Sequence, residues 1–472
     1  THKESKYCIF HASAEEKTED EFIEALKGYV NNIKKEDKDY NFERFIFIGD
    51  IDFRKDLNVT VFKNANFKKA TFEGATFFGN ANFQGVTLFE NATFQRDAFF
   101  RDSTFLGDVD FVAAAFAKAT IFFGVTFKGH SNFIGVYFLG YADFREATFE
   151  RDSKFWGVTF ERDAHFEETT FKGEADFRKV KFELLNNFMG ATFEGGADFA
   201  NAIFSPGNKL NLIVKGSGII SFEHTFLENI FLDLDLDDGV FIDLTDALLR
   251  NTKTKKKQIE NHILQEEKKE FSHAREIYLL LKNNFHSIGR YNDEGWAFKN
   301  EKYMERLSYS FYPYRKALEK KVKKERFPIL KWICTRDFNK WIQSLFSNLI
   351  YGYGEEPRNV VITGLVIIFL FALIFSYTGI GSPEFIELKG PIIQEVPGND
   401  IEIIFKGSLQ NRIIKHFFKS LYFSLITFTT LGYGDLRPLE GCGRIFTGGE
   451  AFIGAIMMAL FVYTFARRTG GR

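Results

Sequence analysis

The stretch Ala142-Asp143-Phe144-Arg145-Glu146-Ala147-Thr148-Phe149 contains the repeating unit that decides the fold of a large part of this chain. Phenylalanine occupies position 67 and every eleventh position after it through 199. A second series runs from position 72 by elevens through 204, and each series has thirteen members without a gap. Together they use 26 of the 60 phenylalanines, at alternating intervals of five and six residues. This period fits neither an amphipathic helix nor a long flat strand.

A small or medium side chain stands two positions before each of these phenylalanines, as Ala142 does before Phe144. The pattern predicts a solenoid of short sides, with the phenylalanine and the small residue inside and polar residues outside. The segment resembles the pentapeptide-repeat family, whose fold is a right-handed quadrilateral β-helix, in a variant with an 11-residue double repeat. The resemblance implies four sides and 22 residues per coil. Thirteen units then make about six and a half coils, roughly 31 Å tall at the spacing of stacked strands.

We expect an N-terminal helix and a solenoid cap over residues 1–60, with the first coil beginning over 42–53, and the β-helix itself over 61–250. Between Lys63 and Phe204 there are 15 basic and 19 acidic residues. This balance is too even for the DNA mimicry of some pentapeptide-repeat proteins, so no nucleic-acid partner is expected. We interpret the solenoid as a rigid scaffold or interaction surface. Sensing of an unknown cytoplasmic ligand or protein is the alternative.

A second motif, Thr430-Leu431-Gly432-Tyr433-Gly434-Asp435, follows the helix-like run 417–429. A potassium ion crosses a bilayer only when something replaces its hydration shell, and rings of backbone carbonyls do so. Successive carbonyls point the same way when the backbone alternates between ordinary and left-handed conformations. Gly432 and Gly434 adopt the left-handed conformation without steric cost. Residues 430–434 therefore predict a filter that binds K⁺ ions, with Asp435 at the pore mouth.

Two apolar segments flank this motif. Residues 360–377 carry no charge, and their 18 residues span about 27 Å as a helix, close to the thickness of a hydrocarbon core. Residues 445–466 carry one charge, Glu450. The order of membrane helix, pore helix, filter and membrane helix is the order that a potassium-selective pore requires.

The stretch 422–438 resembles the pore helix and filter of two-helix potassium channels, and the resemblance covers the pore domain that we place at 359–472. It implies a homotetramer in a lipid bilayer, because one chain supplies only one wall of the ring. Gly454 stands where such channels often carry a hinge glycine. The resemblance implies that the inner helix lines the cavity and forms any gate, with the contributing residues Gly454, Met458, Val462 and Tyr463.

The chain departs from the family pattern at two places. Ile426 stands where some members have a buried acid behind the filter, and Tyr422-Phe423 stands where an aromatic pair is often Trp-Trp. A carboxylate such as Glu450 is expensive inside a membrane unless it pairs or reaches water. Glu450 is therefore either an acid near the headgroups or a contact behind the filter that replaces the acid missing at Ile426.

A second Gly-Tyr-Gly sequence, at 352–354, has no preceding threonine pair and no pore helix. We interpret it as the turn that enters the first membrane helix. Before it, the segment 327–358 contains a helix over 327–349 that is expected to lie along the inner membrane surface. Residues 251–326 are highly charged and predict a helical linker, a hairpin of helices 273–287 and 293–310. The linker either transmits a signal from solenoid to pore or serves as a spacer.

Lys and Arg set the orientation of membrane helices. Eight basic and two acidic residues lie in 315–331, and Arg467, Arg468 and Arg472 follow the second apolar segment. Both flanks are therefore expected to be cytoplasmic, with the 378–410 connection outside. The basic run 315–331 either binds anionic lipid or only sets this orientation. The combined architecture resembles bacterial pentapeptide-repeat proteins fused to an ion channel, which implies a multi-pass protein of a bacterial plasma (inner) membrane.

The three cysteines are too scattered for a disulfide framework or a zinc site, and the nine histidines show no metal-ligand or triad spacing. The chain contains no phosphate loop and no nucleophile motif, so neither an enzyme nor an organic cofactor is expected. The sequence thus predicts a multi-domain chain that forms a homotetrameric potassium channel. The alternatives are a weakly selective cation channel and a membrane-anchored interaction scaffold with a silent pore.

Overall fold

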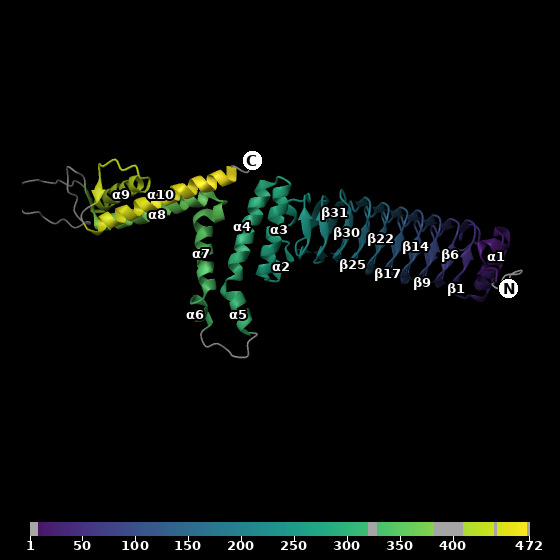
Figure 1. Cartoon of the computed structure of the whole chain (residues 1–472). Coiled ribbons are helices and arrows are strands. Elements are labelled where there is room, and N and C mark those ends of the chain that lie inside the picture. Colours follow the sequence, from purple (N-terminus) through teal and green to yellow (C-terminus); the bar gives the residue numbers. More distant parts are fainter. Residues whose placement is uncertain (1–7, 320–327, 382–408, 439–440, 470–472) are drawn as a thin grey trace, which may run out of the picture. The chain divides into compact units, whose positions relative to one another are not determined.

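The computed structural model describes residues 8–319, 328–381, 409–438 and 441–469 (Figure 1). The chain divides into two compact units, Thr1–Glu301 and Lys302–Arg472. The first unit contains a β-solenoid with a helix at each end, and the second contains the helices of the candidate pore.

The first part of the solenoid has four short strands in each coil, and each strand pairs in parallel with the strand four places later in the chain. Seven such coils follow one another. Their strands are β1 (Tyr40–Asn41), β2 (Ile46–Phe47), β3 (Ile51–Asp52), β4 (Val61–Phe62), β5 (Ala65–Asn66), β6 (Thr71–Phe72), β7 (Thr76–Phe77), β8 (Asn82–Phe83), β9 (Thr87–Leu88), β10 (Thr93–Phe94), β11 (Ala98–Phe99), β12 (Thr104–Phe105), β13 (Val109–Asp110), β14 (Ala115–Phe116), β15 (Thr120–Ile121), β16 (Thr126–Phe127), β17 (Ser131–Asn132), β18 (Tyr137–Phe138), β19 (Ala142–Asp143), β20 (Thr148–Phe149), β21 (Ser153–Lys154), β22 (Thr159–Phe160), β23 (Ala164–His165), β24 (Thr170–Phe171), β25 (Ala175–Asp176), β26 (Lys181–Phe182), β27 (Asn186–Asn187) and β28 (Ala191–Phe193).

The phenylalanine series form the interior of these coils. All 26 rings are buried, and the most exposed of them, Phe204, is only 6% exposed. Rings 22 residues apart stack on each other: the centroid of Phe133 lies 5.0 Å from that of Phe111 and 4.9 Å from that of Phe155. Offset stacking of this kind stabilises a pair beyond the area that it buries. The predicted 22-residue coil with an aromatic interior is confirmed.

One corner in every eleven residues is a turn around a left-handed residue. Positive φ angles recur from Lys69 (55°) by elevens to Asn201 (59°), thirteen positions in all. At each corner the amide three residues after a phenylalanine donates to that phenylalanine's carbonyl, as Ala147 N does to Phe144 O at 3.1 Å. A β-turn with positive φ at its third residue is type II, which favours Gly or Asn there. The 11-residue period is therefore present in the backbone conformation as well as in the buried phenylalanines.

The last coils have three sides. The strand β31 (Lys209–Val214) is long enough to pair with both β27 and β28, so that two sides of the solenoid merge into one. The interior of β31 consists of Leu210, Leu212 and Val214, all 0% exposed, in place of phenylalanine. The remaining strands are β29 (Ala197–Asp198), β30 (Ile203–Phe204), β32 (Ile219–Ser221), β33 (Phe226–Glu228), β34 (Phe231–Leu236), β35 (Phe241–Asp243) and β36 (Leu248–Arg250).

The solenoid is consequently longer than the phenylalanine series alone indicates. Two of its sheets contain ten strands, against the six and a half coils expected. The first strand begins at Tyr40, close to the segment 42–53 in which we expected the first coil to begin. Aliphatic side chains continue the interior where the Phe pattern stops, which is why counting phenylalanines underestimates the length.

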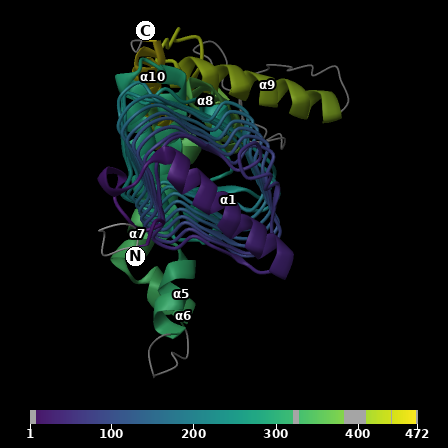
Figure 2. The same cartoon turned by 90° about the vertical axis from the view of Figure 1, so that its right-hand side faces the viewer.

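Helices close both ends of the solenoid. After η1 (Ala14–Glu16), α1 (Glu19–Glu36) lies across the first coil, as Figure 2 shows, with the Phe22 ring 5.7 Å from that of Phe47. At the other end, η2 (Lys256–Gln258), α2 (Leu264–Glu267) and α3 (Phe271–Ser287) follow the last strand. Asn284 of α3 accepts from Thr252 N and donates to Thr252 O, both at 2.9 Å. These contacts satisfy backbone groups that the last coil would otherwise leave open.

The helix α4 (Tyr291–Ser308) follows α3 after Gly289, so the two helices lie close to the expected ranges 273–287 and 293–310. The second unit continues with α5 (Phe311–Glu319), α6 (Pro328–Ile333), α7 (Arg336–Tyr351), η3 (Gly352–Gly354), α8 (Pro357–Thr378), β37 (Ile380–Gly381), α9 (Leu409–Phe428), β38 (Arg437–Pro438) and α10 (Cys442–Thr469). Of these, α8 and α10 are long and apolar enough to cross a membrane.

The single helix expected over 327–349 is divided into α6 and α7. Thr335 has an extended backbone (φ −87°, ψ 160°), and its hydroxyl accepts a hydrogen bond from Phe338 N at 3.2 Å. A threonine in this position caps a new helix because it satisfies an amide that has no partner in the first turn. The Gly-Tyr-Gly sequence at 352–354 forms η3, which connects α7 to α8 as expected for a turn.

We predict that Phe133→Ala lowers the free energy of unfolding of the solenoid by about 3–5 kcal/mol, because the ring is stacked on both sides and leaves a cavity. Phe226, which is 59% exposed on the same solenoid, is the matched control. Phe226→Ala should cost well under half as much. Urea unfolding followed by circular dichroism measures both, and equal losses would contradict a stacked aromatic core.

We predict that Gly135→Ala destabilises the solenoid by about 1 kcal/mol, because a side chain disfavours left-handed backbone. Gly135 has φ 64° and no atom within 4 Å of an added Cβ, so this substitution tests the backbone conformation alone. Gly79 is also uncrowded but does not have a positive φ. Gly79→Ala should therefore leave the urea midpoint unchanged or raise it. A lower midpoint for both variants would argue against the turn.

Candidate pore and filter

The helix α9 packs against α8 through pairs of residues that are separated by multiples of four along each helix. His416 Nε2 lies 3.1 Å from Ser376 O, and Ser424 Oγ donates to Ile368 O at 2.8 Å. One turn further, an added Cβ at Gly364 would lie 3.3 Å from the ring of Phe428. The two helices therefore run in opposite directions, with polar and small side chains along the contact.

The helix α10 packs against the same stretch of α9, and the two contacting pairs are each 26 residues apart in the sequence. Ser424 is hydrogen-bonded to Glu450, and Phe428 contacts Gly454. An added Cβ at Gly454 would lie 1.9 Å from the Phe428 carbonyl oxygen, so only glycine fits. Gly454 is thus a point of close backbone contact with the end of the pore helix, while its predicted role at a gate remains a prediction.

The segment after α9 folds back on the end of that helix. Leu431 N and Gly432 N both donate to Ile426 O, at 3.0 and 3.3 Å, and Thr430 N donates to Thr427 O at 3.0 Å. No peptide bond of the described residues is cis. In a trans peptide the carbonyl points opposite to the amide N–H that follows it. The carbonyls of Thr429, Thr430 and Leu431 therefore point away from the pore helix.

Both glycines of the motif have left-handed backbone, as predicted, with φ 47° at Gly432 and 78° at Gly434. Thr430 also has a positive φ, 56°, which the sequence did not indicate. A left-handed conformation costs an ordinary L-residue about 1–2 kcal/mol, and β-branching makes it rarer still. The sharp return of the chain after Phe428 requires a conformation of this kind at its first corner.

The outer end of the motif is attached to the rest of the second unit in two ways. Asp435 accepts from Leu436 N at 3.1 Å, and its carboxylate interacts with the hydroxyl of Tyr422 of α9. In addition, β38 pairs with β37, the segment directly after α8. These contacts attach Asp435 to the end of α9 through Tyr422, and its place at the pore mouth stays a prediction.

The residues expected at the cavity lie on α10, where Gly454, Met458 and Val462 follow one another at intervals of four and share a face. Met458, Val462 and Tyr463 are 52%, 63% and 52% exposed, and the buried residue of that turn is Met457. Tyr463 also approaches η3, where an added Cβ at Gly354 would lie 3.2 Å from its ring. Arg467 forms an ion pair with Glu355 at 3.0 Å. The cytoplasmic end expected for α10 is therefore attached to the start of α8.

Sequence reasoning did not single out Ser424, which joins three helices. A signal was present: Ser420 and Ser424 stand four residues apart on the same helix, and both are 0% exposed. Glu450 is also 0% exposed and contacts Ser424. An acid near the headgroups does not fit a side chain that is buried against Ser424, and the contact behind the filter stays a prediction.

The helices before the pore carry a cluster of aromatic side chains. Trp332 is buried, and its ring lies 5.0 Å from Phe338 and 5.6 Å from Trp341. On α7, Phe346 and Leu349 are more than half exposed. Part of the basic run 315–331, residues 320–327, lies outside the described residues. Most of the 378–410 connection lies outside them as well.

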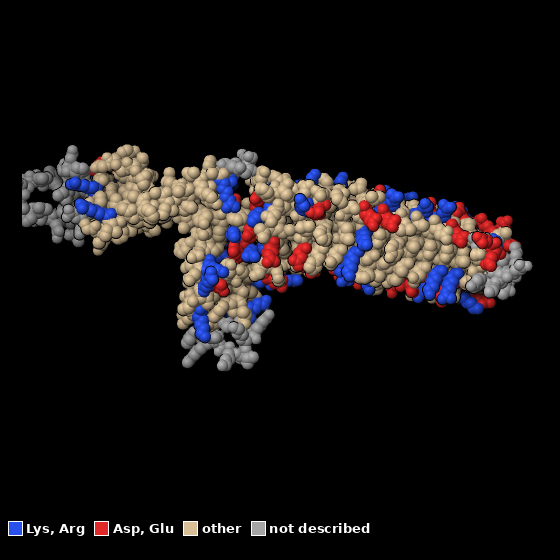
Figure 3. Space-filling model, viewed as in Figure 1, with Lys and Arg blue, Asp and Glu red and all other residues tan. Residues whose placement is uncertain are grey.

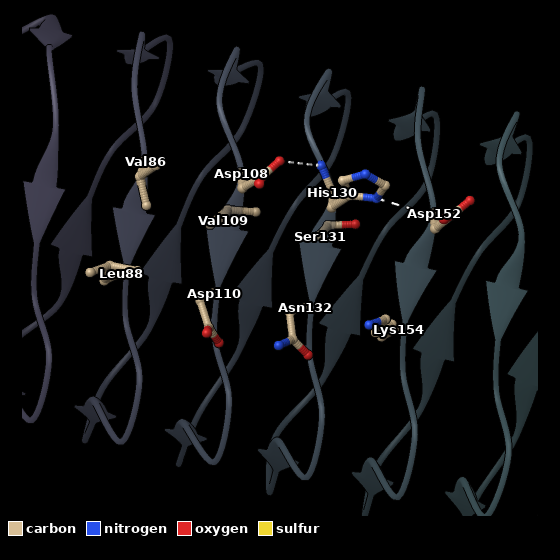
Figure 4. A pocket seen from close by; sticks show the side chains of 10 residues that line it. All are labelled: Val86, Leu88, Asp108, Val109, Asp110, His130, Ser131, Asn132, Asp152 and Lys154. Carbon is tan, nitrogen blue, oxygen red and sulfur yellow. Dashed lines mark hydrogen bonds and ion pairs between the residues drawn. The ribbon is translucent and has the colours of Figure 1, made fainter.

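The solenoid surface offers shallow grooves and mixed charge. In Figure 3 basic and acidic side chains are interspersed along it. One groove, of about 450 Å³, is shown in Figure 4, where Asp108, His130 and Asp152 lie on successive coils. Asp108 accepts from His130 N at 2.8 Å, and burial raises the pKa of Asp110 beside them. The lining repeats every 22 residues, so the groove follows from coil stacking and identifies no ligand.

Two family models match the chain. Residues 392–470 match the model described as "Ion channel", and residues 133–181 match the model described as "Pentapeptide repeats (9 copies)". The chain is also 29% identical over 82 residues to a protein named "Calcium-gated potassium channel TvoK" from Thermoplasma volcanium. The aligned region is 16% of this chain and 24% of that protein, so the chain spans about a quarter of this relative. No solved structure matches the chain.

The observed fold and the family matches indicate the same two domains in this chain. The pentapeptide-repeat match falls inside the four-sided coils, and the ion-channel match covers α9, the filter-like motif and α10. The chain therefore combines a pentapeptide-repeat β-solenoid with an ion-channel domain that contains two apolar helices of membrane-spanning length.

Proposed function

We propose that four copies of this chain form a potassium-selective channel that conducts K⁺ passively through residues 430–434. The observation that carries the proposal is the direction of the backbone after α9. Three successive amides, those of Thr430, Leu431 and Gly432, are hydrogen-bonded back to the pore helix. The carbonyls that precede them face the opposite side, where a ring of such oxygens would replace the hydration shell of K⁺.

The exposure of the motif supports an oligomer. Leu431 and Tyr433 are 61% and 69% exposed in the single chain, although both are large apolar or aromatic side chains. Neighbouring copies would cover them, and four is the number expected for this filter motif. Asp435 would lie at the outer mouth of the pore. Met458, Val462 and Tyr463 on α10 would line the cavity or form a gate.

The orientation follows from the distribution of basic residues. Lys and Arg are concentrated before α8 and after α10, so we place the solenoid and the C-terminal end in the cytoplasm of a bacterium. The exposed face of α7, with Phe346 and Leu349, would lie at the inner surface of the plasma membrane. The basic run 315–331 would bind anionic lipid headgroups there.

Regulation by the cytoplasmic part is supported by the contacts of the cytoplasmic end of α10. Tyr463 packs beside Gly354, and Arg467 pairs with Glu355. Both partners belong to the short segment that connects α7 to α8. A ligand or protein bound to the solenoid would reach the pore through this connection. The ion pair is partly exposed, so its strength would fall with salt.

We predict that purified chain in liposomes passes K⁺ much faster than Na⁺ and that Gly432→Ala abolishes this selective flux. The added Cβ disfavours the left-handed backbone that turns the filter carbonyls. Gly441→Ala is the matched control, since Gly441 also has a positive φ, 87°, and an uncrowded Cβ position outside the filter. Equal K⁺ and Na⁺ fluxes would support a weakly selective channel, and no flux under any condition would support a membrane-anchored scaffold.

We predict that Gly454→Ala separates α10 from the pore helix and destabilises the membrane unit by at least about 1–3 kcal/mol, the usual effect of overpacking. Gly449, in the same helix, has no atom within 4 Å of an added Cβ. Gly449→Ala should be neutral or stabilising, because alanine favours helix. Thermal unfolding in detergent measures both variants. Unchanged stability of Gly454→Ala would mean that Gly454 acts only as a hinge.

A further inference from the structure

Glu450 is an acidic side chain inside the helix bundle of the second unit. It is 0% exposed, so all of its surface is covered by its own chain and a neighbouring subunit cannot reach it. Its Oε1 atom is hydrogen-bonded to Ser424 Oγ, and its Oε2 atom has no hydrogen-bond partner among the described residues. No basic side chain of the described part pairs with it. The conduction path proposed above makes no use of this group.

The number of hydrogens at Ser424 determines how this group is bonded. Ser424 Oγ lies within hydrogen-bonding distance of two acceptors, Ile368 O at 2.8 Å and Glu450 Oε1. A hydroxyl has one hydrogen and can donate to only one of them. The carbonyl of Ile368 can only accept, so it takes the hydrogen of Ser424. When Ser424 donates to Ile368 O in this way, the hydrogen between Oγ and Oε1 comes from the carboxyl group.

The alternative arrangement is energetically poor. If Ser424 donated to an ionised Glu450, one hydrogen bond would serve the whole carboxylate, and Oε2 would remain a buried, unpartnered anionic oxygen. A buried charge without a partner is among the most expensive features of a membrane protein. A neutral carboxyl group leaves only a carbonyl oxygen without a partner, which costs much less.

We propose that Glu450 is a positioning residue that, as a neutral carboxylic acid, donates to Ser424 and so ties α10 to the pore helix and, through Ile368, to α8. The inference rests on the proposed filter role of residues 430–434. This tether lies one helical turn before the Phe428–Gly454 contact and next to the fold-back of the filter onto α9. A movement of α10 would therefore shift the base of the filter.

The test compares variants of the full chain in liposomes and in detergent. Glu450→Gln keeps an uncharged donor for Ser424, whereas Glu450→Leu removes both the donor and the polarity. Ser424→Ala removes the other partner. Ser420→Ala is the matched control, because Ser420 is equally buried on the same helix and its hydroxyl has no hydrogen-bond partner among the described residues. K⁺ flux, Na⁺ flux and thermal unfolding of the membrane unit are measured for each variant.

We expect Glu450→Gln and Ser420→Ala to keep the K⁺/Na⁺ flux ratio of the parent within about twofold. This is the deviation usually seen for substitutions that do not interact with the measured site. Glu450→Leu and Ser424→Ala should each lower the ratio about tenfold, as loss of a buried hydrogen bond implies. The double variant should lose no more than either single one. Infrared spectra of the parent and Glu450→Gln should differ by the C=O stretch of a protonated acid.

Two results would overturn the tether. A Glu450→Gln variant as defective as Glu450→Leu would show that the negative charge is what matters. A Glu450→Leu variant with parental stability and selectivity would show that the contact between Glu450 and Ser424 contributes to neither property. Thermal unfolding needs no conduction, so a silent parent chain would reject the proposed channel and still leave the tether testable: destabilisation by Glu450→Leu and not by Glu450→Gln supports it, and equal behaviour rejects it.

Discussion

Left-handed backbone at fixed positions determines the geometry of both units of this protein. In the solenoid one such residue in every eleven turns the chain through a corner, and the amide after it closes the turn on a phenylalanine carbonyl. In the pore domain three such residues, Thr430, Gly432 and Gly434, alternate with ordinary ones. The same steric rule therefore turns the solenoid at regular corners and turns the chain after α9 so that the carbonyls of residues 429–431 point away from that helix.

Much of the solenoid could be predicted from its sequence because its core is written in one residue type. The period of the phenylalanines gives the coil length, and burial of all 26 rings confirms their direction. The left-handed corners were not predictable in the same way, since Lys69 and Glu146 occupy positions where Gly135 also occurs. The change from four to three sides was not predictable either, because the aliphatic residues that fill these coils, such as Leu212, do not recur at a fixed period.

The candidate site shows a similar division. The left-handed conformation of Gly432 and Gly434 was predictable, because two glycines at this spacing indicate positive φ angles. The positive φ of Thr430 was not, because it depends on how the chain folds back after α9. The pair Ser424 and Glu450 is separated by 26 residues, so no local pattern links them. The contact between Gly454 and Phe428 likewise depends on how α10 packs against α9, which the sequence does not indicate.

The helices at the ends of the solenoid have a consequence for association. Each coil pairs in parallel with the next, so an uncovered first coil would present unpaired strand edges to another molecule. The helix α1 occupies that position with Phe22, Leu26, Val30 and Ile33 buried. It thereby covers the strand edges of the first coil. Sequences could gain or lose whole coils between the helices at the two ends, which makes the length of the rod an independently adjustable property of this architecture.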